Sequence, residues 1–145
     1  ARRCTIYYAL CIAGAAVFDN SIALVGHRVY QTDLLSGRVL PFSLVFKAAR
    51  ATPVNYAVSV RLFDASGAQI AQEDRDAFAL GMSRSARWAP GEVVGDYFEL
   101  PVPGPGRYQI GVLLYERLPD GSLRNAVIAG ASEPVLRLPP VELGR

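Results

Sequence analysis

His27 is the single histidine of this chain, so a catalytic triad or a histidine-containing metal site would have to use it. The sequence contains no G-x-S-x-G motif, no pair of histidines and no Cys-x-x-Cys motif to accompany it. The serines of the stretch 83–85 read as part of a polar loop. We therefore interpret His27 as a structural or surface residue, and we expect a protein that is not an enzyme and uses no cofactor.

Acidic side chains are the second group that could do chemistry, either as oxygen ligands for Ca²⁺ or as a glycosidase pair. The candidates are Asp64, Glu73, Asp74, Asp76, Glu92 and Asp96. None of them falls in a D-x-D-x-D-G spacing, and no spacing singles out two of them as a pair. Turn and strand-end roles explain Asp64 and Asp96 equally well, so the sequence predicts no metal site.

Aromatic side chains are the third group, because rings exposed on a sheet can stack against sugars. They are Tyr7, Tyr8, Tyr30, Tyr56, Tyr97, Tyr108, Tyr115 and Trp88. The alternative interpretation, which the pattern favours, places most of these rings in the core and at strand ends. An exposed row of aromatic rings on one sheet would instead indicate a carbohydrate-binding module.

The elements that must position these residues are predicted by alternation of apolar and polar side chains. Period-two runs bounded by glycine, proline and aspartate turns predict strands. The expected strands are 22–30, 39–48, 56–63, 69–74, 93–100, 108–115, 123–128 and 135–138, and Gly26 suggests a bulge in the first of them. With no convincing helix after residue 20, the sequence predicts an all-β fold, an antiparallel β-sandwich of jelly-roll or immunoglobulin-like type with about eight strands. The domain is expected over 19–140, with 141–145 as a tail.

Composition and charge narrow the range of partners. The chain has 145 residues, of which 51% are hydrophobic and 19% charged, and this suits one well-packed domain. The formal net charge is +2, and every basic residue except Lys47 is an arginine. These arginines are dispersed, with no basic run longer than two, whereas a nucleic-acid surface requires clustering. We expect no nucleic-acid partner.

The N-terminal segment 1–18 is the most apolar part of the chain. Residues 6–18 carry no charge, yet this run is shorter than the roughly 20 residues of a membrane-spanning helix. It can be the end of such a helix, a membrane-associated segment or a wholly buried strand, and the strand is slightly favoured over the helix. Cys4 and Cys11 lie seven residues apart, a spacing that disfavours a disulfide between them in a regular segment, and each reads as a buried thiol.

A buried strand in a neighbouring chain would make this segment an assembly element. Strand addition to a partner's sheet satisfies the backbone and can grow a filament. The assembly residues expected for this are Ile6, Tyr8, Leu10 and Ile12. The partner would be another protein or a second copy of this chain, with membrane contact at the N-terminus and carbohydrate as the other partners to consider.

The run 88–116 carries a resemblance to a known family. Its landmarks are Trp88, Pro90, Gly91 and Asp96, followed by Gly106, Tyr108 and Tyr115. The chain resembles, over about residues 20–138, the C-terminal extracytoplasmic β-sandwich domain of bacterial membrane glycosyltransferases, the mannosyltransferase-like proteins of Chloroflexi-type bacteria. The resemblance implies a sandwich fold and an extracytoplasmic location, at the cell surface or secreted. It gives no support to transferase activity, because the membrane helices and catalytic loops of those enzymes are not in this sequence.

The sequence therefore leads to two hypotheses for function. The first is a non-catalytic extracytoplasmic β-sandwich that acts as an assembly or accessory subunit, polymerising through its N-terminal segment. The alternative is a carbohydrate-binding module of a cell-envelope or glycosyltransferase system. An N-terminal segment packed into another chain would favour the first hypothesis. An exposed aromatic row on one sheet would favour the second.

Overall fold

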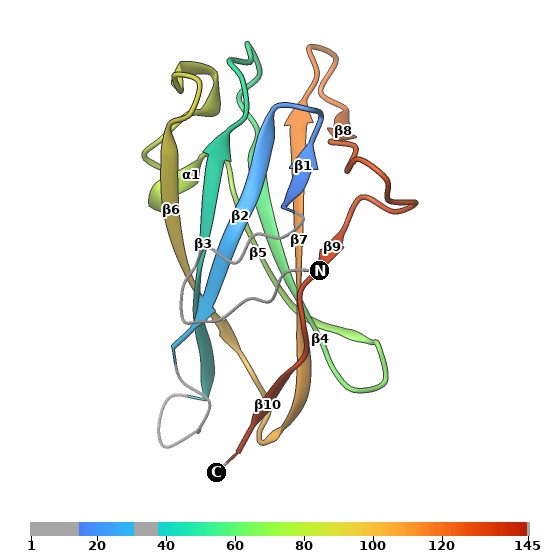
Figure 1. Ribbon diagram of the computed structural model, residues 1–145. Coiled ribbons are helices and arrows are strands. Elements are labelled where there is room, and N and C mark those ends of the chain that lie inside the picture. The colour runs from blue at the N-terminus through green and yellow to red at the C-terminus, as the bar shows by residue number, and fades with distance from the viewer. Residues whose placement is uncertain (1–14, 31–37, 145) are drawn as a thin grey trace.

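The computed structural model describes residues 15–30 and 38–144, which form two antiparallel sheets facing each other (Figure 1). Strands account for 54% of the described residues and helices for 6%. The expected all-β sandwich is confirmed, with ten strands in the described ranges where about eight were expected.

The first sheet has the strand order β1-β2-β3-β6. Its strands are β1 (Ala16–Phe18), β2 (Ile22–Val29), β3 (Val39–Ala48) and β6 (Val93–Pro101). The bulge expected at Gly26 is present, because the register between β2 and β3 shifts between Leu24 and Gly26. The sheet ends at β6, the strand on which the site described below depends.

The second sheet is built around one long strand. Its strands are β4 (Ala57–Phe63), β5 (Gln69–Arg75), β7 (Gly106–Arg117), β8 (Leu123–Asn125), β9 (Leu136–Arg137) and β10 (Val141–Leu143). β4 pairs with β5 and with β7, while β8, β9 and β10 pair in turn with successive stretches of β7. Two short elements, α1 (Phe78–Gly81) and the 3₁₀ turn η1 (Ser85–Arg87), lie between β5 and β6.

The core lies between the two sheets and follows the alternation seen in the sequence. In β6, and in β3 from Phe42 onward, every second side chain is buried, as period-two packing requires. The rings of Phe42 and Phe98 stack across these strands with centroids 5.5 Å apart. The residues that alternate with the buried ones along each strand face outward. The same alternation therefore builds the core and determines the outer surface of the sheet.

Residues 141–145 are not a simple tail, as the sequence had suggested. Val141 and Leu143 pair with the beginning of β7, and Leu143 is 3% exposed. The expectation was wrong because the partner strand lies far away in the sequence, so local composition carries no signal of the pairing. Two other expected strands are shorter than predicted: the 123–128 strand ends at Asn125, and the 135–138 strand covers only Leu136–Arg137.

The boundary expected after residue 18 falls inside a hairpin. β1 pairs with β2 across the Asp19-Asn20 turn, whose residues have φ of 50° and 55°, as hairpin turns favour. Phe18 is fully buried, so β1 belongs to the sandwich. The assembly residues Ile6, Tyr8, Leu10 and Ile12, together with both cysteines, lie outside the described residues. Within the described residues, no helix is long and apolar enough to cross a membrane.

Candidate functional site

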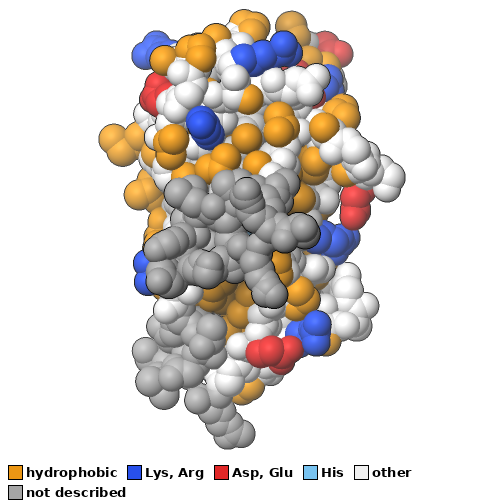
Figure 2. Space-filling model, viewed as in Figure 1, with side chains coloured by type: hydrophobic (Ala, Val, Ile, Leu, Met, Phe, Trp, Pro, Cys, Tyr) orange, Lys and Arg blue, Asp and Glu red, His pale blue; other side chains and the backbone are white. Residues whose placement is uncertain are grey.

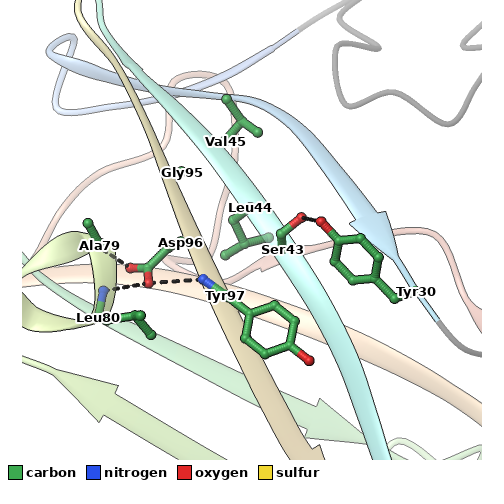
Figure 3. A pocket seen from close by; sticks show the side chains of 9 residues that line it. All are labelled: Tyr30, Ser43, Leu44, Val45, Ala79, Leu80, Gly95, Asp96 and Tyr97. Carbon is green, nitrogen blue, oxygen red and sulfur yellow. Dashed lines mark hydrogen bonds between the residues drawn. The ribbon is translucent and has the colours of Figure 1, made fainter.

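A shallow groove of about 370 Å³ lies on the outer face of the first sheet, where it crosses β3 and β6 between the end of β2 and α1 (Figure 3). Its lining residues are Tyr30, Ser43, Leu44, Val45, Ala79, Leu80, Gly95, Asp96 and Tyr97. This volume is at the lower end of the range for small-molecule sites.

Strand register brings two exposed tyrosines together in this groove. Tyr97 lies opposite Ser43 in the β3–β6 pair, and the backbone N–H of Tyr30 donates to the carbonyl of Pro41 over 3.0 Å. Tyr30 is 50% exposed and Tyr97 is 38% exposed. Their ring centroids lie 5.9 Å apart with 54° between the planes, so the two rings present adjoining aromatic faces to solvent.

Hydroxyl groups line the end of the groove at Tyr30. The Tyr30 hydroxyl lies 2.8 Å from the Ser43 Oγ, and the Tyr97 hydroxyl donates to the Glu99 carboxylate over 2.8 Å. That hydrogen bond to Glu99 raises the pKa of the Tyr97 phenol, so the phenol is neutral at physiological pH. The Arg28 guanidinium carbon lies 4.9 Å from the centroid of the Tyr30 ring, within cation–π range.

The other end of the groove is apolar and has an open floor. Leu80, which is 63% exposed, and Ala79 line the groove from α1, and Val45 lines it from β3. Gly95 is paired with Val45, and a side-chain carbon built at Gly95 would meet no atom within 4 Å. Figure 2 shows hydrophobic side chains at the surface on the side of the molecule where α1 and β6 lie. A ligand can therefore lie flat over Gly95 without displacing protein atoms.

The Asp96 carboxylate fixes α1 against β6. Its side chain is fully buried, and it forms an ion pair with Arg75 at 2.7 Å. It also accepts the backbone N–H groups of Ala79 and Leu80, each over 3.0 Å, and that of Tyr97 over 3.1 Å. The Asp96 carboxylate thus binds both α1, which forms the wall of the groove, and the backbone of Tyr97, whose ring lines the groove.

The α1 segment is a left-handed turn by its backbone angles rather than a helix. Ala79 and Leu80 have φ of 52° and 59°, a conformation that costs non-glycine residues about 1–3 kcal/mol each. Two hydrogen bonds between the backbones of Phe78 and Ser83, of 2.8 and 2.9 Å, close the turn. The two strained residues themselves donate their N–H groups to Asp96, so this carboxylate holds Leu80 in place at the rim of the groove.

The residues that carry the family resemblance are largely structural. Trp88 is 4% exposed; its ring lies 4.7 Å from that of Phe78, and its indole N–H donates to Ser83 Oγ over 2.7 Å. Tyr108 and Tyr115 are each 5% exposed, and their hydroxyls donate to the carbonyl of Gly104 and to the Asp74 carboxylate.

The remaining landmarks of the resemblance belong to turns and to the groove. Pro90 and Gly91 form a corner, in which Gly91 has φ of 86° and donates its N–H to the carbonyl of Ala48. Gly106 begins β7 and pairs with Leu143. Of this set, Asp96 alone lines the groove, together with Tyr30 and Tyr97 from the aromatic candidates.

The other candidates for chemistry are not brought together. His27 is partly buried, and this burial lowers the pKa of its imidazole. The Asp64 carboxylate accepts bonds within its own turn, from Ser66 and Ala68. Within 15–30 and 38–144, no three histidine, cysteine or acidic side chains are grouped as metal ligands would be.

A second hollow, of about 510 Å³, lies beside the β1–β2 turn, and two of its charged side chains, Asp19 and Arg124, pair with each other. The Asp19 carboxylate accepts the Tyr56 hydroxyl over 2.6 Å and the N–H of Val127 over 2.9 Å, and it pairs with Arg124. Arg124 in turn pairs with Glu116 at 2.7 Å. These contacts tie the turn after β1 to the residue before β4 and to β7 and β8, so we assign them a structural role.

Comparison with known proteins identifies the fold but no family. No family model matches the chain, and no curated protein matches it. Among solved structures, the chain is similar to the crystal structure of the C-terminal domain of Wzt. The TM-score is 0.54 at 10% sequence identity, and the match covers 90% of this chain and 86% of that one. The likeness is one of fold. It supports a related β-sandwich and does not test the resemblance to glycosyltransferase domains.

Proposed function

We propose that this chain is a non-catalytic, carbohydrate-binding β-sandwich. The observation that carries the proposal is the pair of exposed rings, Tyr30 and Tyr97, on one face of one sheet beside the open floor at Gly95. An exposed aromatic row is the feature that separates a binding module from an assembly subunit. Tyrosine suits sugars because it combines a flat apolar face with a hydroxyl at its edge.

The groove offers the two kinds of contact that a sugar needs. A pyranose ring can stack its C–H face on Tyr97 above Gly95. Its hydroxyls can then exchange hydrogen bonds with the Tyr30–Ser43 hydroxyl pair and with the Glu99 carboxylate. The groove is shallow and solvent-exposed, so we expect a dissociation constant on the order of 0.1–1 mM for a short glycan. Repetition along a polysaccharide would raise the apparent affinity.

The sequence resemblance to glycosyltransferase C-terminal domains supports the setting of this proposal. In that setting the domain faces outward from the cytoplasmic membrane, and its ligand is a glycan of the cell envelope. The domain then acts as an accessory that holds the glycan, while another protein carries out any reaction on it.

The test is a glycan array followed by calorimetry on the glycans that bind. Tyr97→Ala should weaken binding at least tenfold, because it removes the stacking surface. Gly95→Val should also abolish or weaken binding, because the valine side chain occupies the floor of the groove. It should leave the fold intact, because that space is open and valine suits a strand. Leu123→Ala is the matched control, because Leu123 is 55% exposed on the second sheet. Wild-type protein that binds no glycan, or variants at Tyr97 and Gly95 that bind as wild type does, would overturn the proposal.

A further inference from the structure

We infer that the groove selects 6-deoxyhexoses, sugars that carry a methyl group where a hexose carries a hydroxymethyl group. This inference rests on the proposed function and specifies the class of sugar. It comes from the opposite chemical character of the two ends of the groove, which fixes how a sugar can lie in it.

At the α1 end, the nearest polar groups are already bonded within the protein. The Asp96 carboxylate takes the Arg75 guanidinium and three backbone N–H groups. Two of those N–H groups belong to Ala79 and Leu80, which form this wall. The side chains of this wall are carbon only, from Ala79 and Leu80, and Val45 adds apolar surface on β3 opposite Gly95.

At the opposite end, hydroxyls and a carboxylate are accessible. The Tyr30 hydroxyl lies 2.8 Å from that of Ser43, and the Tyr97 hydroxyl contacts Glu99 over 2.8 Å. Figure 3 shows the Tyr30–Ser43 pair on the side of the groove away from Leu80 and Ala79. A sugar stacked on Tyr97 therefore directs its ring hydroxyls toward Tyr30 and Ser43, and its exocyclic carbon toward Leu80.

That orientation makes the sixth carbon the point of discrimination. A methyl group against Leu80 removes apolar surface from water, which favours binding. A hydroxymethyl group in the same place loses hydration without gaining a partner for its hydroxyl. Because an apolar pocket rejects an added hydroxyl by at most about a hundredfold, and this groove is open, we expect a preference of about 5- to 20-fold for the deoxy sugar.

Leu80 can be replaced by a polar residue without disturbing the turn that carries it. Leu80→Asn places an amide against the sixth carbon, and asparagine tolerates the left-handed φ of 59° at this position. The variant should therefore fold, and its preference for the deoxy sugar should fall to about twofold or less. Met82→Asn is the control, because Met82 is 85% exposed in the same turn and does not line the groove.

The experiment is an NMR titration of the full chain with matched pairs of methyl glycosides: L-fucoside with L-galactoside, and L-rhamnoside with L-mannoside. A 5- to 20-fold preference for the deoxy member of at least one pair, retained in Met82→Asn and lost in Leu80→Asn, supports the inference. Equal binding of both members of each pair overturns it and leaves the proposed function standing. A preference that Leu80→Asn does not change refutes the role of Leu80. If neither these glycosides nor any glycan on the array binds, the proposed function fails, and the inference fails with it.

Discussion

Replacing Asp96 by alanine is expected to destabilise the fold more than any other change to the groove. The side chain is fully buried, and it forms an ion pair with Arg75 and accepts three backbone N–H groups. Removing one member of a buried pair costs about 3–5 kcal/mol, because the remaining charge loses its partner. The backbone N–H groups of Ala79 and Leu80 also lose their acceptor.

The structure places the expected loss at the lower end of that range. Arg75 keeps Glu73 at 2.7 Å, the carbonyl of Tyr97 at 2.7 Å and the Phe98 ring at 4.0 Å. The freed N–H groups belong to a surface turn, so water can reach them. We therefore expect Asp96→Ala to lower the free energy of unfolding by about 3 kcal/mol. Asp96→Asn, which keeps one acceptor oxygen, should cost about half as much.

Urea titration followed by circular dichroism measures this loss. Glu142→Ala is the matched control, because Glu142 pairs with Arg107 at 3.5 Å on the surface and should change the free energy of unfolding by at most about 0.5 kcal/mol. A loss below about 1 kcal/mol for Asp96→Ala would show that the carboxylate does not hold α1 against β6. The geometry of the groove wall would then need another explanation.

Three further predictions concern the rest of the fold. Trp88→Ala, which empties a buried site beside Phe78, should cost about 3–5 kcal/mol in a denaturant titration, and a loss below about 1 kcal/mol would contradict its burial. Burial alone would raise the pKa of Asp19, but hydrogen bonds from Tyr56, Val127 and Arg124 lower it overall. The ionised Asp19 carboxylate therefore stabilises the fold above about pH 4, and this contribution is lost as the pH falls further. The deficit of Asp19→Asn at pH 7 should accordingly shrink at pH 3, and a constant deficit would refute this. The assembly hypothesis predicts that the full chain is an oligomer and that deletion of residues 1–14, which spares the buried Phe18 in β1, leaves a folded monomer. Light scattering measures the mass of both proteins, and an unchanged oligomeric mass after the deletion would rule the hypothesis out.

The sequence predicts the central strands well because their pattern is local. In β3 and β6 the alternation of apolar and other side chains appears in the chain itself, and turn residues mark both ends. The pairing of β10 and the bridge from β1 to Ile128 could not be predicted in the same way. Leu143 pairs with Gly106 and β1 contacts Ile128, and contacts between such distant residues leave no local pattern.

The candidate site could be predicted only in part. Tyr30 and Tyr97 are among the aromatic candidates, and the alternation in β6 places Tyr97 on the face opposite the buried Phe98. That these two rings meet depends on the register of three strands, which the sequence does not specify. Leu80 gives no signal at all, because its position follows from a left-handed turn held by a carboxylate 16 residues away in sequence.

The most direct test of carbohydrate binding in this groove is a titration of ¹⁵N-labelled protein with a glycan identified on the array, followed by mapping of the amide shifts. We predict shifts concentrated around the groove, at Ser43, Val45, Leu80, Gly95 and Tyr97, and their loss in Gly95→Val. Saturable shifts confined to the second sheet, or binding that Gly95→Val leaves unchanged, would contradict it.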